Sequence, residues 1–537
     1  MSLGYDIIVI GAGGAGLVAS LTAAELDAKV LLISKSPLGL NNCTTYAGGG
    51  FTYAGLGSDK GVHRAKTLET GRGINDPNLL DTFSGFGPEA VDKLQKWGVT
   101  LIEYERGGTV ATGSPLPGVG GLGMTLPLVA AVKKNDNITC LENWTVVRLL
   151  QDSNGSCTGV LAINLATGTC ETFAAKAVIV ATGGGGRIYS RSNNPYGTTG
   201  DGYHLLGELG CRFRDMEFVQ FYPIGIAETD LPLWFIDLSI IDHAALTDNA
   251  GHPFLLEQFK EWGLSSGREG NLYARDRASI TILKKWHDGD QAWLHLEQLS
   301  DEDWTNRYLS SVLHLNRPAF DFTKNPIRVK PIQHYMSGGI IIDSDGHTDV
   351  PGFFACGEVT GGVDGANRIG GNALTNITLF GQRAAEAAVA YAQEQPMPNP
   401  ISAEYPLLHT WRSNATGTSP IALRQQLQAM MDKEVAPLRT EAGLQEALQH
   451  ICALEEQLPT VVLSSDKDLR EAIELRSLLT TAKLVVTAAL NRTESRGVHY
   501  RHDYAEENPD LQYPFMQKIV SDSHGKTQII TEKLGQG

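Results

Sequence analysis

The sequence predicts an α/β protein whose N-terminal domain binds a dinucleotide. Three observations predict this: a buried strand over Asp6–Ile10, a glycine-rich turn over Gly11–Gly16, and a helix-compatible stretch over Leu17–Leu26. A second apolar strand follows over Lys29–Ile33. Strand, glycine turn, helix and strand in this order are typical of a nucleotide-binding βαβ unit.

The glycines of this turn have separate physical roles. Gly11 permits the tight turn, Gly13 lets the backbone approach a pyrophosphate, and Gly16 lets helix and strand pack closely. The N-terminus of the helix offers free N–H groups and the positive end of its dipole to the phosphates. The second strand ends at Ser34 and not at the acid that commonly binds a ribose, so this motif alone leaves the identity of the nucleotide open.

Length and charge limit the classes of protein that fit the chain. With 537 residues it is too long for a single core, and roughly two to four domains are expected. The formal charge of −16, without a long basic run, predicts that nucleic acid is not a partner. No apolar stretch is long enough to cross a bilayer, so no direct membrane span is expected.

The number and spacing of the cysteines suggest which cellular compartment the protein occupies. There are seven, which is an odd number, and they are scattered without a C-x-x-C pair. Neither a disulfide framework nor a zinc or iron–sulfur site is therefore predicted within the chain, and a reducing cytoplasm fits best.

Two later strands end in glycine turns. Val178–Gly184 is a buried strand of the type that closes around the flavin dinucleotide in flavoproteins with two dinucleotide-binding folds. Gly352–Glu358 is a short strand that ends in a Gly-acid pair, and Glu358 resembles the acid that binds the ribityl hydroxyls of the flavin in such proteins.

These pieces, in this order and over the whole chain, resemble the fumarate reductase, succinate dehydrogenase and L-aspartate oxidase flavoprotein family. The pair His334–Ile340 and Gly365–Leu374 is the strongest match because both motif and spacing agree. The other matching stretches are Leu32–Lys35, Thr44–Gly50, Thr199–Gly202, Met216–Phe221 and Glu494–Arg501.

The resemblance implies a fold with an inserted domain. It predicts a Rossmann-like FAD domain of the two-dinucleotide-binding type, built from residues 1–232 and 331–395. An α+β capping domain over 233–330 and a C-terminal helical domain with a tail over 396–537 complete it. Helices are expected over Ala422–Val435 and Asp468–Leu490.

The resemblance also implies a cofactor site for FAD. The residues that it places there are Gly11, Gly13, Gly14, Ala15, Gly16, Ser34, Lys35, Thr44, Thr45, Gly48, Gly49, Gly50, Ala181, Thr182, Gly183, Asp201, Glu358, Arg368, Asn372, Ala373 and Leu374. Cys43 stands where membrane-bound relatives carry the histidine that bonds to the flavin, so FAD is expected to be held non-covalently.

Cationic residues suit an organic-acid substrate. The resemblance implies that Arg368 and His334 hold a carboxylate and that Arg275 moves a proton at the carbon beside the hydride site. Arg277 is a poorer match for that role. Without the resemblance, the favoured interpretations would be structural: a surface ion pair for Arg275, a core imidazole for His334 and a loop anchor for Arg368.

The substrate site departs from the family pattern. Tyr222 stands where the family has a histidine that helps to bind the second carboxylate of a dicarboxylic acid. In the cap, Ile236 and Asp237 align with a Thr-Glu pair and Ile240 with an arginine of the proton relay. Tyr222 and Asp237 are retained as catalytic candidates, and plain fumarate is not the expected substrate.

Several functions remain open at this point. The first is interconversion of a carbon–carbon single and double bond next to a carboxylate by hydride transfer at FAD, in an enzyme acting on CH–CH groups. The second is an amino-acid oxidase like L-aspartate oxidase, although the Glu105–Gly123 stretch shows no clear acid for the substrate amine. The third is an FAD-bearing electron-transfer subunit. An iron–sulfur or other electron-transfer partner, and membrane association through it, are expected only by family resemblance.

Overall fold

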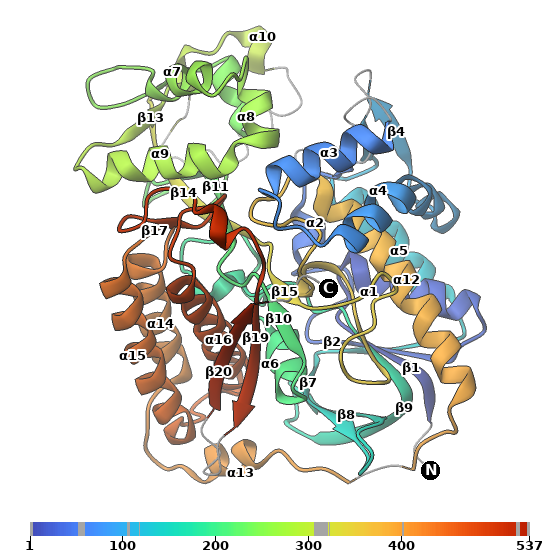
Figure 1. Cartoon of the computed structure of the whole chain (residues 1–537). Helices are drawn as coiled ribbons and strands as arrows, with labels where there is room; N and C mark the ends of the chain where they lie inside the picture. Colours follow the sequence, from blue (N-terminus) through green and yellow to red (C-terminus); the bar gives the residue numbers. More distant parts are fainter. Residues whose placement is uncertain are drawn as a thin grey trace.

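A mixed β-sheet with strand order β6-β2-β1-β9-β8-β7, and with β16 beside β9, forms the centre of the FAD domain (Figure 1). The computed structural model describes residues 4–51, 59–104, 108–116, 119–304, 321, 323–399, 402–521 and 527–533. The parallel strands are β1 (Tyr5–Ile10), β2 (Val30–Ser34), β6 (Ile138–Glu142), β16 (Phe353–Ala355) and the second half of β9 (Cys170–Val180). Their apolar runs are buried because helices cover the sheet.

Strand β9 changes partners along its length. Its first half pairs antiparallel with β8 (Cys157–Asn164), which continues to β7 (Trp144–Gln151). Its second half, from Ala175 to Val180, pairs in parallel with β1. The strand therefore ends at the same edge of the sheet as β1 and β16, which is where ligands bind in open α/β sheets.

Helices α1 (Gly14–Glu25) and α12 (Asn372–Glu394) pack together against this sheet. The helix predicted over Leu17–Leu26 is confirmed, but it begins at Gly14, inside the predicted turn. A Cβ atom at Gly16 would lie 1.8 Å from the carbonyl oxygen of Gly11. Only a glycine at position 16 therefore allows the helix to approach the turn this closely.

The capping region lies above the other layers in Figure 1 and has a hydrophobic core of its own. Its sheet has the order β11-β14-β13-β12, and helix α9 packs on β11 and β14. The strands are β11 (Val219–Ile226), β12 (Leu246–Thr247), β13 (Ala292–Leu294) and β14 (Ile327–Met336), and the helices are α7 (Phe254–Glu261), α8 (Gly267–Tyr273), α9 (Arg275–His287) and α10 (Asp301–Trp304). This sheet joins strands from both sides of the predicted cap boundaries, and the domain limits themselves stay a prediction.

The C-terminal region is helical, as predicted, and shares the main core. The predicted helices are confirmed as α14 (Pro420–Glu434) and α16 (Asp466–Asn491), with α15 (Glu441–Gln457) between them. Their buried leucines belong to the same hydrophobic cluster as β1 and α1. Strands β19 (Phe515–Ser521) and β20 (Thr527–Lys533) extend a small sheet through β10 (Arg212–Arg214) to β15 (Gly339–Ile340), so the tail is not purely helical.

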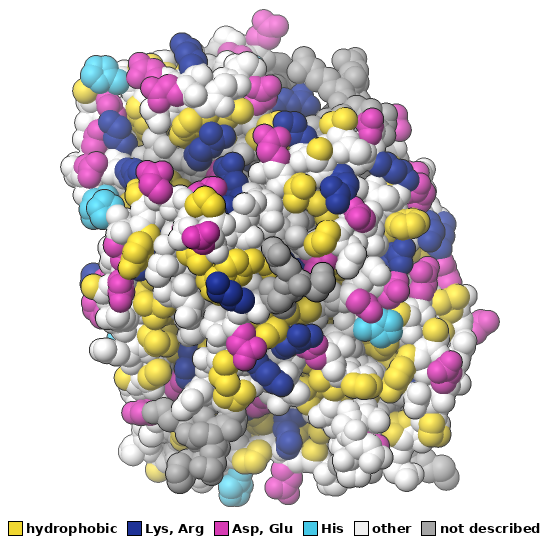
Figure 2. Space-filling model, viewed as in Figure 1, with side chains coloured by type: hydrophobic (Ala, Val, Ile, Leu, Met, Phe, Trp, Pro, Cys, Tyr) yellow, Lys and Arg dark blue, Asp and Glu magenta, His cyan; other side chains and the backbone are white. Residues whose placement is uncertain are grey.

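The smaller elements complete the chain. They are α2 (Cys43–Tyr46), β3 (Gly50–Phe51), α3 (Lys60–Thr70), α4 (Pro77–Asp92), β4 (Leu101–Tyr104), β5 (Gly108–Ala111), α5 (Leu122–Lys134), α6 (Asp201–Glu208), α13 (Pro406–Ser413), β17 (Leu438–Arg439) and β18 (Tyr500–Arg501). None of the helices in the described ranges combines the length and the apolarity that crossing a bilayer requires. On the face shown in Figure 2, acidic and basic side chains are interspersed.

Buried charges join the C-terminal region to the FAD domain. Arg492 pairs with Glu217 and Glu494, and all three side chains are fully buried. Glu494 also pairs with Arg496 at 2.8 Å. Removing one partner of such a network leaves an uncompensated buried charge.

We therefore expect Arg492→Met to lower the free energy of unfolding by about 3–5 kcal/mol. The matched control is Arg212→Met, which breaks the largely exposed pair of Arg212 with Asp349 and is expected to cost about 0–1 kcal/mol. Chemical unfolding followed by tryptophan fluorescence measures both. Equal losses in the two variants would contradict the importance of the buried network.

Candidate active site

Two adjoining cavities run along the carboxyl edge of the main sheet. The large cavity has a volume of about 830 Å³, and the narrow cavity one of about 120 Å³. Cys43, Thr44, Glu358 and Ile377 line both of them. An elongated ligand could thus extend from one cavity into the other.

The narrow cavity is built around the glycine turn after β1. The residues expected to bind FAD that line it include Gly11, Gly13, Gly14, Ala15, Ser34, Lys35, Ala181, Thr182, Gly183 and Asp201. Gly11 has a φ of 105°, which favours glycine. The N-cap residue Gly13 has no capping side chain, and the Gly14 N–H donates to the Thr44 hydroxyl at 3.1 Å, so the N-terminus of α1 borders the cavity as an anion site to which Thr44 also belongs.

A charged network closes the narrow cavity. The Lys35 ammonium lies 2.7 Å from a carboxylate oxygen of Asp201 and 2.9 Å from one of Glu474. Burial acts to raise the pKa of Asp201, but Lys35 and Thr199 outweigh it and hold the pKa below its ordinary value. Asp201 therefore stays ionised at neutral pH.

The large cavity meets the N-terminus of α12. Gly371 precedes this helix with a φ of 92°, and no side chain caps the helix. Gly371, Ala373 and Leu374 line the cavity on one side, and the strip Cys43–Thr44 with Gly48, Gly49 and Gly50 lines the other. A Cβ atom at Gly48 or Gly50 would meet no protein atom within 4 Å, so these backbones border open space.

Glu358 lies where the two cavities meet. Its carboxylate accepts a hydrogen bond of 3.1 Å from the backbone N–H of Met336. Burial raises the pKa of Glu358 to about 7, against the opposing effect of that bond and of Arg368. A buried carboxylate with spare acceptor capacity suits a ligand that bears hydroxyl groups.

Three predicted cofactor residues lie outside both linings: Gly16, Thr45 and Asn372. Gly16 allows α1 to pack closely against the glycine turn. The Thr45 hydroxyl bonds to the carbonyl of Gly39, and Asn372 bonds to His63 at 3.0 Å. The Thr45 and Asn372 side chains therefore serve the protein interior, because local hydrogen bonds draw them away from the cavity.

Arg275 enters the large cavity from the first turn of α9. Its Nε donates to the backbone carbonyl of Asn271 at 2.7 Å and to the Asn271 side-chain oxygen at 3.1 Å. Burial lowers the pKa of Arg275 to about 10, and Arg368 adds to this shift. The guanidinium is therefore a much better proton donor than an exposed arginine.

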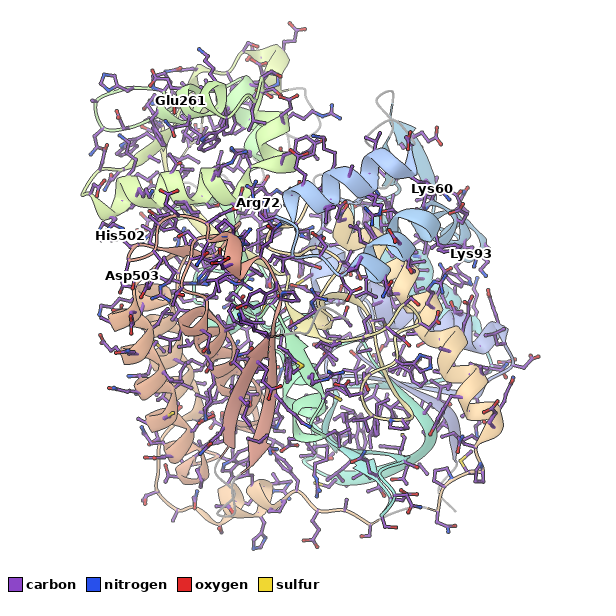
Figure 3. The ribbon with its side chains drawn as sticks, viewed as in Figure 1. Lys60, Arg72, Lys93, Glu261, His502 and Asp503 are labelled. Carbon is purple, nitrogen blue, oxygen red and sulfur yellow. The ribbon has the colours of Figure 1, made fainter. Side chains whose placement is uncertain are left out.

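The start of α9 is fixed to the FAD domain by an ion pair. Asp276, next to Arg275, lies 2.6 Å from a guanidinium nitrogen of Arg72. Figure 3 labels Arg72 at the junction between the cap and the FAD domain. On the other side, a Cβ atom at Gly370 would lie 2.6 Å from the Arg275 guanidinium, so the glycine makes room for it.

His334 and Arg368 lie together in the large cavity, as predicted. Burial lowers the pKa of His334 well below its ordinary value, and the charges of Arg368 and Arg275 lower it further, so the imidazole is neutral. Asn193 fixes the ring through a contact of 3.0 Å to Nδ1. Arg368 is 5% exposed, and its Nε has no hydrogen-bond partner in the part of the chain that the structure describes.

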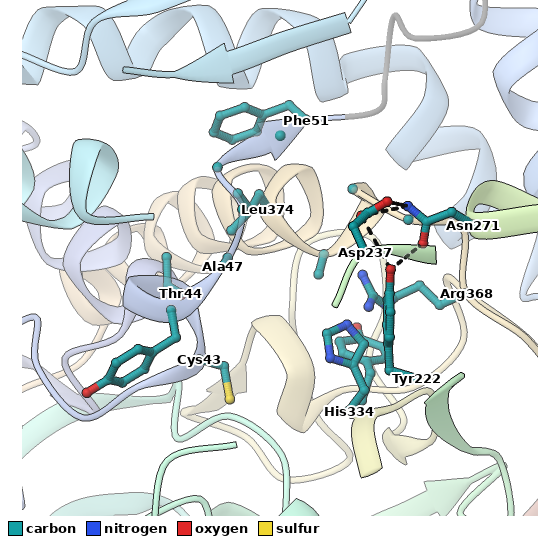
Figure 4. A pocket seen from close by; sticks show the side chains of 18 of the residues that line it. Cys43, Thr44, Ala47, Phe51, Tyr222, Asp237, Asn271, His334, Arg368 and Leu374 are labelled. Carbon is teal, nitrogen blue, oxygen red and sulfur yellow. Dashed lines mark hydrogen bonds between the residues drawn. The ribbon is translucent and has the colours of Figure 1, made fainter. Parts of the chain in front are cut away.

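Tyr222, Asp237 and Asn271 form a polar cluster at the cap side of the cavity (Figure 4). The Tyr222 hydroxyl donates to the Asn271 oxygen at 2.7 Å and lies 3.3 Å from Asp237. The Asn271 amide donates to Asp237 at 3.0 Å. Asn271 thus connects the two predicted residues to Arg275.

The two isoleucines next to this cluster in the sequence, Ile236 and Ile240, lie in the hydrophobic core of the cap. They are 3% and 2% exposed. Neither lines a cavity, while Phe235, Asp237 and Ser239 do. These two positions therefore supply no polar group to a ligand.

Sequence reasoning missed three residues of this site: Asn193, Asn271 and Phe235. Asn271 lies four positions before Arg275, a spacing that brings side chains together on helical turns and could have suggested it. Asn193 and Phe235 carry no such signal. Part of the Glu105–Gly123 stretch, at 105–107 and 117–118, lies outside the described residues.

The walls fit FAD. Two uncapped helix N-termini, open glycine backbones and Glu358 provide sites for pyrophosphate, a flat ring and hydroxyl groups along one path. Burial raises the pKa of the Cys43 thiol far above its usual value, so it is unreactive. Within the described ranges, no group of three His, Cys, Asp or Glu side chains could hold a metal ion.

The chain is similar over most of its length to known FAD-dependent proteins. Residues 6–374 match the family model of the FAD binding domain, and residues 424–534 match that of the fumarate reductase flavoprotein C-terminus. The chain is 29% identical to a fumarate reductase (CoM/CoB) subunit of Methanothermobacter marburgensis, over 94% of this chain and 95% of the relative. It is 31% identical to L-aspartate oxidase of Caulobacter vibrioides, over 94% of each chain.

A solved structure of the same family has a similar fold. Quinol fumarate reductase of E. coli superposes with a TM-score of 0.87 at 26% identity, covering 99% of this chain and 97% of the other. The predicted fold class, an α/β FAD domain with capping and helical regions, is thereby confirmed. The chain belongs to the fumarate reductase and succinate dehydrogenase flavoprotein family and is an FAD-dependent oxidoreductase.

Proposed function

We propose that this oxidoreductase interconverts a carbon–carbon single and double bond next to the carboxylate of an organic acid whose other end carries no second carboxylate. The observation that carries this proposal is the grouping of Arg368, His334 and Arg275 on one side of the large cavity. The FAD-binding residues are those named above that line the two cavities, with backbone contacts at α1 and α12.

Arg368 and His334 hold the carboxylate. The buried Nε of Arg368 has no hydrogen-bond partner within the described ranges, and a carboxylate matches the guanidinium fork. The Nδ1 atom of His334 lies 3.0 Å from the Asn193 amide nitrogen and accepts a hydrogen bond from it. The proton of the neutral imidazole is then on Nε2, which can donate one hydrogen bond to the substrate. Each charge-assisted bond contributes on the order of 1.5–3 kcal/mol.

Arg275 moves the proton. FAD, when bound, supplies the hydride acceptor or donor at its N5 atom. The lowered pKa of Arg275 lets it deliver a proton to the neighbouring carbon, and the bond to Asn271 fixes its guanidinium. Tyr222 and Asp237 orient Asn271 and thus the arginine. The buried cavity excludes water from the reacting atoms.

Apart from Arg275, which lies over the Tyr222 ring, the cap side of the cavity has no buried arginine or lysine among the described residues that line it. Tyr222 replaces a histidine of the family, and Ile236 and Ile240 lie in the cap core. A second carboxylate there would be desolvated with little compensation. This supports an acid with an uncharged or cationic tail.

A second candidate function is oxidation of an amino acid, as the name of the Caulobacter relative suggests. Asp237 favours it, because its carboxylate could accept a hydrogen bond from a substrate amine. We also propose a separate electron-transfer protein, iron–sulfur or other, as partner, since the name of the Methanothermobacter relative describes one component of a larger complex.

The first prediction from this proposal concerns cofactor attachment. Acid precipitation should release all of the yellow colour as free FAD, because Cys43 is a half-buried thiol with a raised pKa and not a flavin-linking histidine. Cys43→Ser should hold the same amount of FAD. Absorbance of the supernatant and of the denatured pellet near 450 nm, roughly where oxidised flavin absorbs, measures this. Colour left on the washed pellet would contradict it.

Replacing Arg275 by Gln should lower turnover by about a hundredfold or more while FAD content is unchanged, because a general acid contributes about 10²–10⁴ in rate. The matched control is Arg277→Gln on the same helix, whose guanidinium lies over Trp262 and not in the cavity. Steady-state rates compare the two. A loss for Arg275→Gln within about tenfold, or roughly 1.4 kcal/mol of barrier, would remove Arg275 from the mechanism.

The substrate test uses chemically reduced enzyme and a panel of unsaturated acids. We expect kcat/KM for fumarate to be roughly ten- to thousand-fold below that for an enoate with an uncharged or cationic tail, because one or two lost polar partners cost about 1–3 kcal/mol each. Fumarate with the highest kcat/KM would refute the proposal. Hydrogen peroxide formed in air from an amino acid alone would favour the second candidate.

A further inference from the structure

The cap side of the large cavity carries an acidic group, Asp237, that shares the Asn271 side chain with Arg275. Every hydrogen bond that Asp237 accepts in the described residues comes from a neutral group, namely Ser239, Asn271 or Tyr222. Asp237 Oδ2 accepts one hydrogen bond of 3.0 Å from the Asn271 amide, and the single hydroxyl hydrogen of Tyr222 is used at 2.7 Å on Asn271, so the second lone pair of Oδ2 has only the long 3.3 Å contact to Tyr222. This oxygen can therefore accept a bond from a ligand.

Aromatic rings form a continuous wall between this acid and the carboxylate end. The ring of Phe235 lies 4.7 Å from that of Tyr222 and 5.6 Å from that of His334. Trp234 lies 5.4 Å from Phe235 and extends the row to Tyr46 at 6.2 Å. Tyr46, Tyr222 and Phe235 line the cavity. The Arg275 guanidinium lies over the Tyr222 ring at 4.8 Å, so a flat or cationic tail would contact Phe235 and the edge of Tyr222.

The charges around the cavity divide it into two ends. Arg275 and Arg368 lie at the carboxylate end, and Glu358 borders the dinucleotide path. Around the tail are Asp237 and the exposed Glu103, with the exposed Arg268 at the rim. Arg275 and Asp237 also interact electrostatically, because the charge of Asp237 raises the pKa of Arg275 against the lowering by burial.

From this we infer the substrate class: an acid whose tail is a nitrogen base, such as an imidazole ring, that donates an N–H bond to Asp237 and lies against Phe235 and Tyr222. The inference rests on the proposed function. A second carboxylate in this position would face Asp237, whereas an N–H group or a cation matches both the acid and the aromatic faces.

Urocanate and cinnamate form a matched pair of probes, because both are planar enoates of similar length that differ in an imidazole and a phenyl ring. Each is titrated into the oxidised, FAD-loaded protein, and binding is followed by the visible flavin spectrum. We expect urocanate to bind at least about tenfold more tightly, which corresponds to one charge-assisted hydrogen bond. Equal or tighter binding of cinnamate would overturn the inference.

Variants test the role of the acid. Asp237→Leu should bring the ratio of the two dissociation constants close to one, whatever its effect on turnover. Asp230→Asn, which removes an exposed charge of the cap outside the cavity lining, should leave the ratio unchanged. A ratio that survives in folded Asp237→Leu would show that another group selects the tail and would overturn the inference.

A pH titration of the unaltered protein tests the same inference without a variant that could fail to fold. Urocanate should bind more tightly relative to cinnamate as the pH falls from 8 to 6, roughly the range in which an imidazole gains its proton. Burial raises the pKa of Glu358 to about 7, so this group also changes its charge in this range. Its effect on the shared enoate part of the two acids cancels in the ratio of their dissociation constants. A ratio that is constant or falls toward pH 6 would contradict the inference. If neither acid binds or is reduced while fumarate is, the proposed function fails as well.

Discussion

The parallel pairing of β9 with β1 on one side and β16 on the other is the constraint on which the site depends. Parallel neighbours end at the same edge of a sheet, so three segments far apart in the sequence deliver their glycine turns to one place. Gly11, Gly183 and Glu358 follow these three strands directly or within a few residues. The two cavities lie along this edge, next to the N-termini of the packed helices α1 and α12.

Much of this arrangement could be predicted from the sequence, because backbone demands leave a visible pattern. Gly11 and Gly16 are needed for geometry that no other residue allows, and the strands around them are continuous apolar runs. The site residues His334, Arg368 and Arg275 were found through motif resemblance, and the structure brings them into one cavity. Neither periodicity nor composition would have brought them together.

The parts that were missed depend on side-chain direction. Thr45 and Asn372 belong to matching motifs, but hydrogen bonds to Gly39 and His63 turn them inward. Asn271 is essential to the arrangement around Arg275 only because a break at Ala274 separates two helices and lets its carbonyl and amide face the guanidinium. Such a local break has no signature in hydrophobic patterning, and the same is true of the ring contacts of Phe235.

The cap has a hydrophobic core separate from the one that the FAD domain and the C-terminal helices share. Phe235, Asp237 and Ser239 line the large cavity but not the narrow one around the glycine turn. Substitutions at these three positions therefore alter the cap side of the site, while the turn after β1 keeps its own packing. In an evolving lineage this arrangement lets the choice of substrate change separately from retention of the cofactor.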